Sequence, residues 1–558
     1  MASFATLPTE LQEQIIAELD ISDLSSFSRT CVCVHNAILP FLYRNVSITW
    51  SRCKTVSPTA GLLLRSLLEN NSLGPLIHQL HLLAEKVAAS PPVTDPYPDA
   101  VLDIRSNNDH PIPQALLECN LQKAGIREDE HTEQLSLRKH DAIIALLILN
   151  CNNLEWLDVD TGLLVDNTAL PRAIEHTFRE MGASDYRAYE IEPSKPDVAA
   201  TATTSCPPPR SILRRVFECL RRNGETSEPN TVRGRPEPRI EQHQTKPYVD
   251  YTLNKTRLNG YPSLRRVDMT TTIEDWRLPY YWRLPPRVLV ACLHFPALEE
   301  LHAQYLAPNF THDSAGSPTV DEGWDEASKS DPELPQAERL LTIRLLATSI
   351  NAKGLTRILS LTPSLTRLVY DYYAQGHERC PGRVEWFRYG TLRGSDLRHA
   401  LESVRGTLQY LTVSLTPVKN GKDPLDLFPY TWLGDGVGSL KDFHSLRGLG
   451  IALPVLCGDA QRGLPPPPLA SMLPARLEEF HLTGDVQVWG LFYQYGGGEI
   501  LELIEQFVAV SQEVTPHMKR LKLDVHAMDY PEYIWEKGYS ERAKKLCTET
   551  GLVCEITE

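Results

Sequence analysis

The sequence lacks the short motifs by which many metal and nucleotide sites are recognised. Its twelve cysteines form no Cys-x-x-Cys pair, and its seventeen histidines form no His-x-x-x-His or His-Glu-x-x-His. It also has no Gly-x-x-x-x-Gly-Lys-Ser/Thr loop and no Gly-x-Ser-x-Gly elbow. These absences disfavour a structural zinc site, a zinc hydrolase, a phosphate-binding loop and a serine hydrolase. We therefore expect no catalytic residues, no metal and no cofactor, and we expect the cysteines to be small buried apolar side chains.

Long apolar runs and an excess of positive charge are missing too. The longest clean apolar run, residues 142–149, is far shorter than the ~20 residues that span a bilayer. The first basic residue is Arg29, so the chain does not start with the basic and apolar order of a secretory signal. The formal net charge of −15 disfavours a general nucleic-acid binder. The sequence thus predicts a protein of the cytoplasm or nucleus, with no membrane or nucleic-acid partner.

A compact helical unit is predicted over residues 7–44. Pro8 suits the first turn of a helix, where its missing N–H is not needed. Apolar residues recur at helical spacing over residues 11–19, and again over residues 24–38. The break between them, residues 20–23, is rich in side chains that cap helices. So small a unit buries little surface, and we expect it to rest on the following chain or on a partner.

A Leu-x-x-Leu-x-Leu pattern, with substitutions, recurs along the rest of the chain. Its copies begin at Ile77, Leu154, Leu264, Leu298, Leu365, Leu408, Leu446, Leu477 and Met518. The alternating apolar residues at the end of each copy predict a short strand, and residues 45–48 also look like a strand. Helical stretches are predicted over residues 337–359, 396–404 and 500–510. The repeating unit is therefore a helix, a turn and a short strand.

This unit resembles a leucine-rich repeat. The resemblance implies that the strands pair into one curved parallel sheet with helices outside it. Where adjacent copies can be followed, they lie about 31 to 43 residues apart, against ~20–29 in regular repeats, so we expect an irregular solenoid. Disordered inserts are predicted near residues 88–113, 193–246 and 308–335, which are poor in apolar residues. Within the second insert, residues 210–222 form a basic amphipathic patch, read either as a solvated helix or as a partner-docking segment.

The first residues resemble the F-box motif in order and spacing. The resemblance is carried by Leu7-Pro8-Thr9-Glu10-Leu11, Ile15-Ile16, Leu19, Asp23-Leu24, Phe27-Ser28 and Cys31, and by a fungal-type ending, Leu42-Tyr43-Arg44-Asn45-Val46. The sequence departs from the motif at Val32, where a lysine is common, and at Tyr43, where a tryptophan is common. The chain is therefore expected to have an α/β fold, with a three-helix F-box at residues 1–48 followed by the leucine-rich-repeat-like solenoid at residues 49–558.

The F-box resemblance implies that the chain is a substrate-recognition subunit of a cullin ubiquitin ligase and performs no chemistry itself. The residues expected to contact the Skp adaptor are Leu7, Pro8, Leu11, Ile15, Ile16, Leu24 and Phe27. Leu19, Cys31 and Ile38 are expected to form the core of the helical unit. The solenoid would hold a protein substrate for ubiquitin-dependent degradation.

The substrate surface is predicted on the side chains that lie between the repeated leucines, because these point to the opposite side of each strand. The candidate substrate-binding residues are Trp156, Arg266, Arg367, Tyr410, Glu479 and Arg520. Mixed charges with aromatic anchors favour a protein or peptide partner over nucleic acid.

Two further hypotheses stay open. The chain could be an interaction scaffold that binds the adaptor without substrate ubiquitination. Alternatively, it could be a ligand-binding or enzymatic repeat protein with an F-box-like cap. Adaptor binding separates the last hypothesis from the other two.

Overall fold

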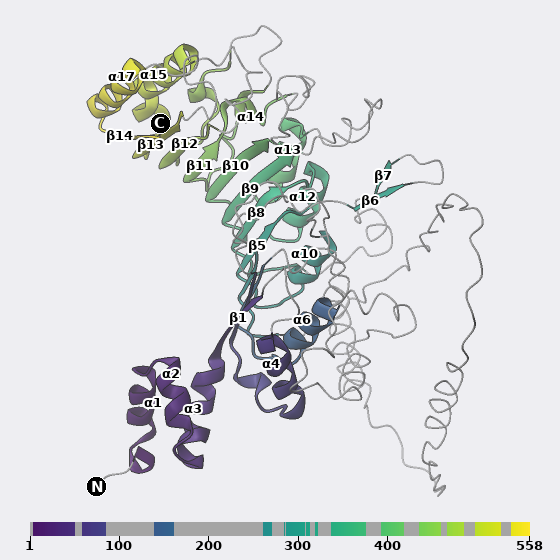
Figure 1. Ribbon diagram of the computed structural model, residues 1–558. Helices are drawn as coiled ribbons and strands as arrows, with labels where there is room; N and C mark the ends of the chain where they lie inside the picture. The colour runs from purple at the N-terminus through teal and green to yellow at the C-terminus, as the bar shows by residue number, and fades with distance from the viewer. Residues whose placement is uncertain are drawn as a thin grey trace, which may run out of the picture. The chain divides into compact units, whose positions relative to one another are not determined.

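The structure is a computed structural model of the full chain (Figure 1). The residues it describes are 4–50, 58–84, 139–160, 261–270, 284, 286–306, 309–312, 318–321, 336–374, 392–417, 435–458, 466–484, 497–525 and 537–557. By its contacts the chain divides into two units, residues 1–184 with 252–558 and residues 185–251. All the described residues belong to the first unit. The inserts predicted near 88–113 and 193–246, with the basic patch at 210–222, lie outside the described residues.

The chain begins with a short 3-10 turn, η1 (Phe4–Thr6), and three helices, α1 (Thr9–Ala17), α2 (Ile21–Ser28) and α3 (Val32–Arg44). Asp20 caps α2, because its side chain accepts the backbone N–H of Asp23 at 2.8 Å. The four buried side chains of this unit form a core separate from that of the rest of the chain. They are Ile16, Leu24, Val34 and Ile38. The predicted helical unit is thus present with the predicted breaks.

One core prediction for this unit is wrong. Cys31 was expected inside, but it is exposed, as is Cys33. Cys31 is the N-cap residue of α3 and has an extended backbone, so it stands outside the regular turns of the helix. Other cysteines fit the expectation of burial; Cys151, Cys292 and Cys547 are all buried.

The part of the chain that the structure describes contributes twelve strands to the main sheet, all parallel, and their order in the sheet follows the chain (Figure 1). They are β1 (Asn45–Trp50), β2 (Gln79–Ala84), β3 (Trp156–Val159), β4 (Arg266–Met269), β5 (Glu300–Gln304), β8 (Thr342–Thr348), β9 (Arg367–Ala374), β10 (Tyr410–Pro417), β11 (Gly448–Ile451), β12 (Glu479–Leu482), β13 (Arg520–Asp524) and β14 (Val553–Thr557). All nine copies of the leucine pattern supply a strand, which begins at the third residue of the copy. The predicted α/β fold with a parallel sheet is confirmed.

The same backbone contact joins neighbouring copies of the pattern and sets their register. The carbonyl of Glu155, the second residue of its copy, accepts the N–H groups of Arg265 and Arg266 at 2.9 and 3.2 Å. The carbonyl of Arg265 then accepts two N–H groups from the following copy, those of Glu299 and Glu300. Because this contact recurs along the sheet, equivalent residues of successive strands stand side by side.

Within the described ranges, eight helices pack with the strands into one continuous apolar core. They are α4 (Pro58–Glu69), α6 (Lys139–Leu149), α10 (Pro286–Leu293), α12 (Ala352–Ser360), α13 (Gly394–Glu402), α14 (Leu453–Cys457), α15 (Gly497–Val514) and α17 (Lys537–Glu549), with the short turns η2 (Gly74–Leu76) and η7 (Leu469–Ser471). The apolar run at residues 142–149 lies in α6, where Ile143 to Ile148 are all buried. Among the described residues, no helix is both long and apolar enough to cross a membrane.

The long helix predicted over residues 337–359 is wrong in its first half. Residues Thr342–Thr348 form strand β8, and only Ala352–Ser360 forms a helix, α12. Leu340, Ile343 and Leu345 are a further copy of the leucine pattern, and all three are fully buried. The adjacent Leu341 lies just before the strand and is exposed.

The insert predicted near 308–335 is not wholly without regular structure. Within it, β6 (Asn309–His312) and β7 (Pro318–Asp321) pair antiparallel as a separate two-stranded sheet. The expectation of disorder is therefore wrong for these two segments, whose short strands escaped a prediction made from composition alone.

Candidate partner-binding surfaces

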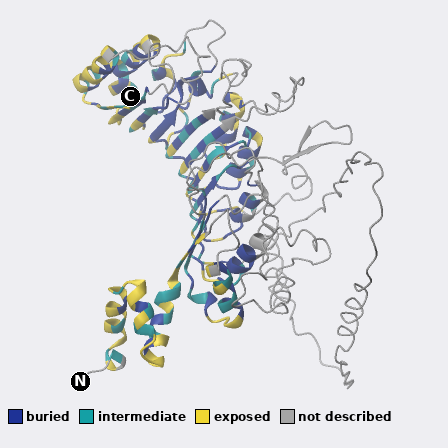
Figure 2. Cartoon of the chain, viewed as in Figure 1, coloured by how far each residue is buried: buried dark blue, intermediate teal, exposed yellow. Residues whose placement is uncertain are grey.

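The first candidate surface is an apolar one on helices α1–α3. Leu11 and Ile15 on α1 are 45% and 42% exposed, and Ile21 at the start of α2 is 72% exposed. Val32, the first residue of α3, is 75% exposed. Figure 2 shows that these helices are largely exposed, in contrast to the buried strands of the main sheet. Large apolar side chains gathered on one small unit are typical of a surface that a partner covers.

The residues expected to contact an adaptor divide into two groups. Pro8, Leu11 and Ile15 are exposed, and Leu7 is half-buried. Phe27 is half-buried and packs edge-on against Phe4, with ring centroids 5.0 Å apart.

The other two expected contact residues, Ile16 and Leu24, are only 2% and 6% exposed. They therefore belong to the core of the three-helix unit and not to the surface of that unit. Ile21 and Val32 are exposed residues that sequence reasoning missed. Val32 had a visible signal, because it stands where the F-box motif often has a lysine.

The second candidate surface is the face of the main sheet that points away from the leucine core. Over strands β2 to β13, two rows of side chains cross it, one from the first residue of each strand and one from the third. The first row runs Gln79, Trp156, Arg266, Glu300, Thr342, Arg367, Tyr410, Gly448, Glu479 and Arg520. The second row runs His81, Asp158, Asp268, His302, Arg344, Val369, Thr412, Gly450, His481 and Lys522. All six predicted substrate-binding residues fall in the first row.

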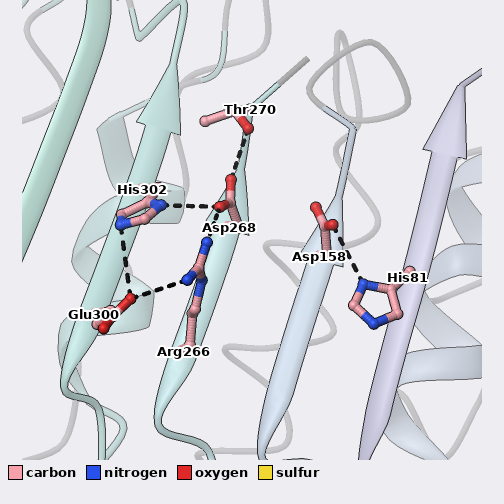
Figure 3. A network of polar contacts seen from close by, with 7 residues as sticks. All are labelled: His81, Asp158, Arg266, Asp268, Thr270, Glu300 and His302. Atoms are coloured by element: carbon pink, nitrogen blue, oxygen red, sulfur yellow. Dashed lines mark hydrogen bonds and ion pairs between the residues drawn. The ribbon is translucent and has the colours of Figure 1, made fainter. Parts of the chain in front are cut away.

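A polar network centred on Asp268 occupies the face over β4 and β5 (Figure 3). Asp268 Oδ2 lies 2.9 Å from His302 Nδ1 and accepts a hydrogen bond of 2.9 Å from Arg266, and Asp268 Oδ1 accepts one of 2.7 Å from Thr270. Arg266 also reaches Glu300 at 3.2 Å. The side chains of Asp268 and His302 are 11% and 7% exposed, so neighbouring groups cover them almost completely.

Asp268 and its neighbour Asp158 have opposite pKa shifts. Burial alone would raise the pKa of Asp268, but the hydrogen bonds from His302, Thr270 and Arg266 outweigh burial and hold the pKa well below its usual range. Burial raises the pKa of Asp158, because a single contact of 3.3 Å with His81 only partly offsets it. The Asp268 charge is thus fixed in place by its partners, whereas the Asp158 charge is poorly compensated.

Two arginines of the first row stack on aromatic rings of the same row. The guanidinium carbon of Arg266 lies 4.5 Å from the centre of the Trp156 ring. That of Arg367 lies 4.8 Å from the centre of the Tyr410 ring. Such cation–π contacts hold long side chains flat against the sheet. They make rigid, partly apolar anchors of the kind common in protein interfaces.

The charges over β12–β14 are paired with one another. Arg520 contacts Glu479 at 3.0 Å and Glu555 at 3.4 Å. On the second row, His481 Nε2 lies 2.6 Å from Asp524, which also lies 3.6 Å from Lys522. This end of the face therefore carries little net charge available to a partner.

The described surfaces are suited to binding. No group of three or more His, Cys, Asp or Glu side chains in the described ranges is arranged to hold a metal ion. No family model matches the chain, and no curated protein matches its sequence. The function has to be argued from the two surfaces and the residues that form them.

Proposed function

We propose that this protein is the substrate-recognition subunit of an SCF-type cullin ubiquitin ligase. Helices α1–α3 bind the Skp adaptor, and the polar face of the main sheet binds the protein substrate. The chain then catalyses nothing; it raises the concentration of substrate beside a ubiquitin-loaded enzyme.

The observation that carries the proposal is the exposed apolar pair Leu11 and Ile15 on α1. Both stand at positions that the F-box resemblance assigns to adaptor contact. They project from a unit whose core, in the residues that the structure describes, consists of four buried side chains. Covering such side chains contributes roughly 1.5–3 kcal/mol each, before the costs of association. An apolar surface on a small helical unit is therefore better suited to a stable partner than to open solvent.

The test is co-purification of the Skp adaptor with the full chain and with a Leu11→Ala, Ile15→Ala double variant. Exposed substitutions of this kind change folding stability little, and circular dichroism confirms that the variant folds. Leu62→Ala is the matched control, because Leu62 on α4 is 47% exposed yet lies outside the three-helix unit.

We expect wild type and Leu62→Ala to retain the adaptor, and the double variant to lose at least tenfold in affinity. A wild-type chain that does not bind the adaptor, or a double variant that binds as well as wild type, would sink the proposal. Ubiquitin transfer to a bound partner then separates a receptor from a scaffold that uses the F-box for another purpose.

A further inference from the structure

The middle of the sheet face, over β8–β10, differs from its two ends in its unpaired cations. Arg344 on β8 and Arg367 on β9 are both exposed. No ion pair joins either arginine to a carboxylate anywhere in the described ranges, whereas Arg266, Arg520 and Lys522 each have an acidic partner. Positive charge is therefore available to a partner at the centre of the face.

The one carboxylate that the same strands present here is already engaged. Asp371 on β9 accepts the backbone N–H of Ala347 at 3.0 Å and the hydroxyl of Ser414 at 3.1 Å. Ala347 lies in a bulge of β8 and has a φ of +45°, a strained value for a residue with a Cβ. Asp371 thus stabilises the bulge through these hydrogen bonds and forms no ion pair with Arg344 or Arg367, both of which the structure describes. Strain of this kind tends to occur at functional sites.

The two arginines are placed to bind two separate anionic groups. Arg367 stands opposite Thr342, while Arg344 stands opposite Val369, so they lie on adjacent strands and one row apart. Strand spacing of ~4.8 Å and a step of ~6.6 Å along the strand separate their Cα atoms by about 8 Å. The Arg367 guanidinium also leans over Tyr410 on β10, away from the strand that carries Arg344.

Each arginine has an apolar neighbour on the next strand. Val369 stands opposite Arg344 and is half-buried. Tyr410 stands opposite Arg367, and its ring lies over Gly448, since a Cβ on Gly448 would come within 2.6 Å of Tyr410 Cδ1. Tyr410 remains 36% exposed. Each row therefore places one cation beside one apolar side chain.

We propose that the face of β8–β10, centred on Arg344, Arg367 and Tyr410, binds an acidic peptide segment in which one carboxylate lies on each side of an apolar residue. Arginine forks bind carboxylates through charge-assisted hydrogen bonds. Two cations on adjacent strands, with Cα atoms about 8 Å apart, fit two carboxylates better than one shared phosphate group. This inference rests on the proposed function in naming the class of substrate segment, but peptide binding is measured without the adaptor.

The test begins with a random peptide library displayed on phage and selected against the full-length chain. The enriched peptides are synthesised with a fluorophore, and their affinity is measured by anisotropy for wild type, Arg344→Glu, Arg367→Glu and Arg339→Glu. Arg339 is the matched control, because it is exposed and precedes β8 in a turn off the sheet face.

We expect enrichment of Asp and Glu, at least tenfold weaker binding by each of Arg344→Glu and Arg367→Glu, and a change of less than twofold in Arg339→Glu. Replacing the peptide's acidic residues by lysine is expected to restore binding to the glutamate variants. The inference is overturned if no acidic peptide is enriched, or if the control weakens binding equally. It is also overturned if phosphoserine peptides without carboxylates bind more tightly.

Adaptor co-purification with Arg344→Glu and Arg367→Glu keeps the two proposals apart. Both variants are expected to retain the adaptor as wild type does. If wild type binds the acidic peptides but not the adaptor, only the proposed ligase role is contradicted. If wild type binds the adaptor but no acidic peptide, only the inference of an acidic-peptide site on β8–β10 is contradicted.

Discussion

The three N-terminal helices and the main sheet expose opposite kinds of side chain. The helices bury four side chains among themselves and leave Leu11, Ile15, Ile21 and Val32 exposed. The sheet buries its apolar residues in one core that includes side chains from Ile48 to Leu552, and it presents charged and aromatic side chains on its other face. An apolar surface gives affinity through burial, whereas a charged one gives specificity through complementarity.

The helical unit and the sheet are also expected to differ in their stability against local unfolding. A unit with so small a core opens more readily than a sheet whose core is continuous over many strands. The substitutions below test this difference, from the largest expected effect to the smallest.

Phe480→Ala is expected to have the largest effect. Phe480 on β12 is 1% exposed and packs edge-on against Phe507 of α15, with ring centroids 6.0 Å apart. Its truncation leaves a cavity that lowers the free energy of unfolding by about 3–5 kcal/mol, measured by chemical denaturation. Hydrogen exchange in α1–α3 should not change. A loss below about 1 kcal/mol would show that the core there is not tightly packed.

Ile38→Ala makes the corresponding cavity in the three-helix unit, since Ile38 is fully buried there. The expected cost is roughly 2–5 kcal/mol, but it is confined to this unit. Amide exchange should accelerate throughout α1–α3 and stay at the wild-type rate in β9–β12. Equal acceleration in the sheet would contradict the separation of the two cores.

Asp268→Asn and Asp158→Asn form a matched pair, because the two residues stand side by side in the second row. Asp268→Asn replaces a charged acceptor of the hydrogen bonds from His302, Arg266 and Thr270 by a single neutral amide oxygen, and it should destabilise the protein by about 1–3 kcal/mol at pH 7. Asp158→Asn should change stability by less than about 0.5 kcal/mol, or increase it, since burial disfavours its charge. Equal losses in both variants, measured by urea denaturation, would contradict this distinction.

The contributions of Asp268 and Asp158 to folding stability depend on pH with opposite signs. The pKa of Asp268 is depressed by folding, so its contribution is complete above the unfolded pKa of ~3.9 and is lost as the pH falls through the lower folded pKa. The pKa of Asp158 is raised, so its unfavourable charge is relieved as the pH falls from neutral through that raised value. The cost of Asp268→Asn should therefore shrink only below about pH 4, whereas any gain from Asp158→Asn should begin to shrink at a higher pH than that; urea denaturation across this pH range measures both.

Gly448→Ala is expected to have only a small effect on stability. The new Cβ would meet the Tyr410 ring at 2.6 Å, and the ring, which is partly exposed, can move aside. The cost should stay under about 1 kcal/mol in thermal unfolding. The displaced ring should nonetheless weaken binding of the acidic peptides selected on the wild-type face. Unchanged peptide affinity would indicate that Tyr410 does not contact them.

The strand positions were accessible from the sequence because the leucine pattern recurs with a constant internal order. Every predicted copy begins its strand at the third residue, and this places all six candidate binding residues in one row. The copy at Leu340 was missed because Leu341 and Leu346 also complete a helical stripe. Only packing against β5 and β9 decides between the two periods.

The contacts between side chains on neighbouring strands could not be predicted from the sequence. His302 and Asp268 are 34 residues apart, and their contact depends on register between strands. In the helical unit, Ile15 and Ile16 are adjacent, and the sequence pattern does not say which of them faces the core. Helix orientation settles this point, with Ile16 buried and Ile15 exposed.

Hydrogen exchange of the full chain with and without the Skp adaptor tests the central claim most directly, namely that the three helices and the sheet are separate binding surfaces. The account predicts added protection in α1–α3, strongest in the peptide that contains Leu11 and Ile15, and no change in β8–β10. Protection that appears on the strands instead, or no protection on adding a saturating amount of adaptor, would contradict it.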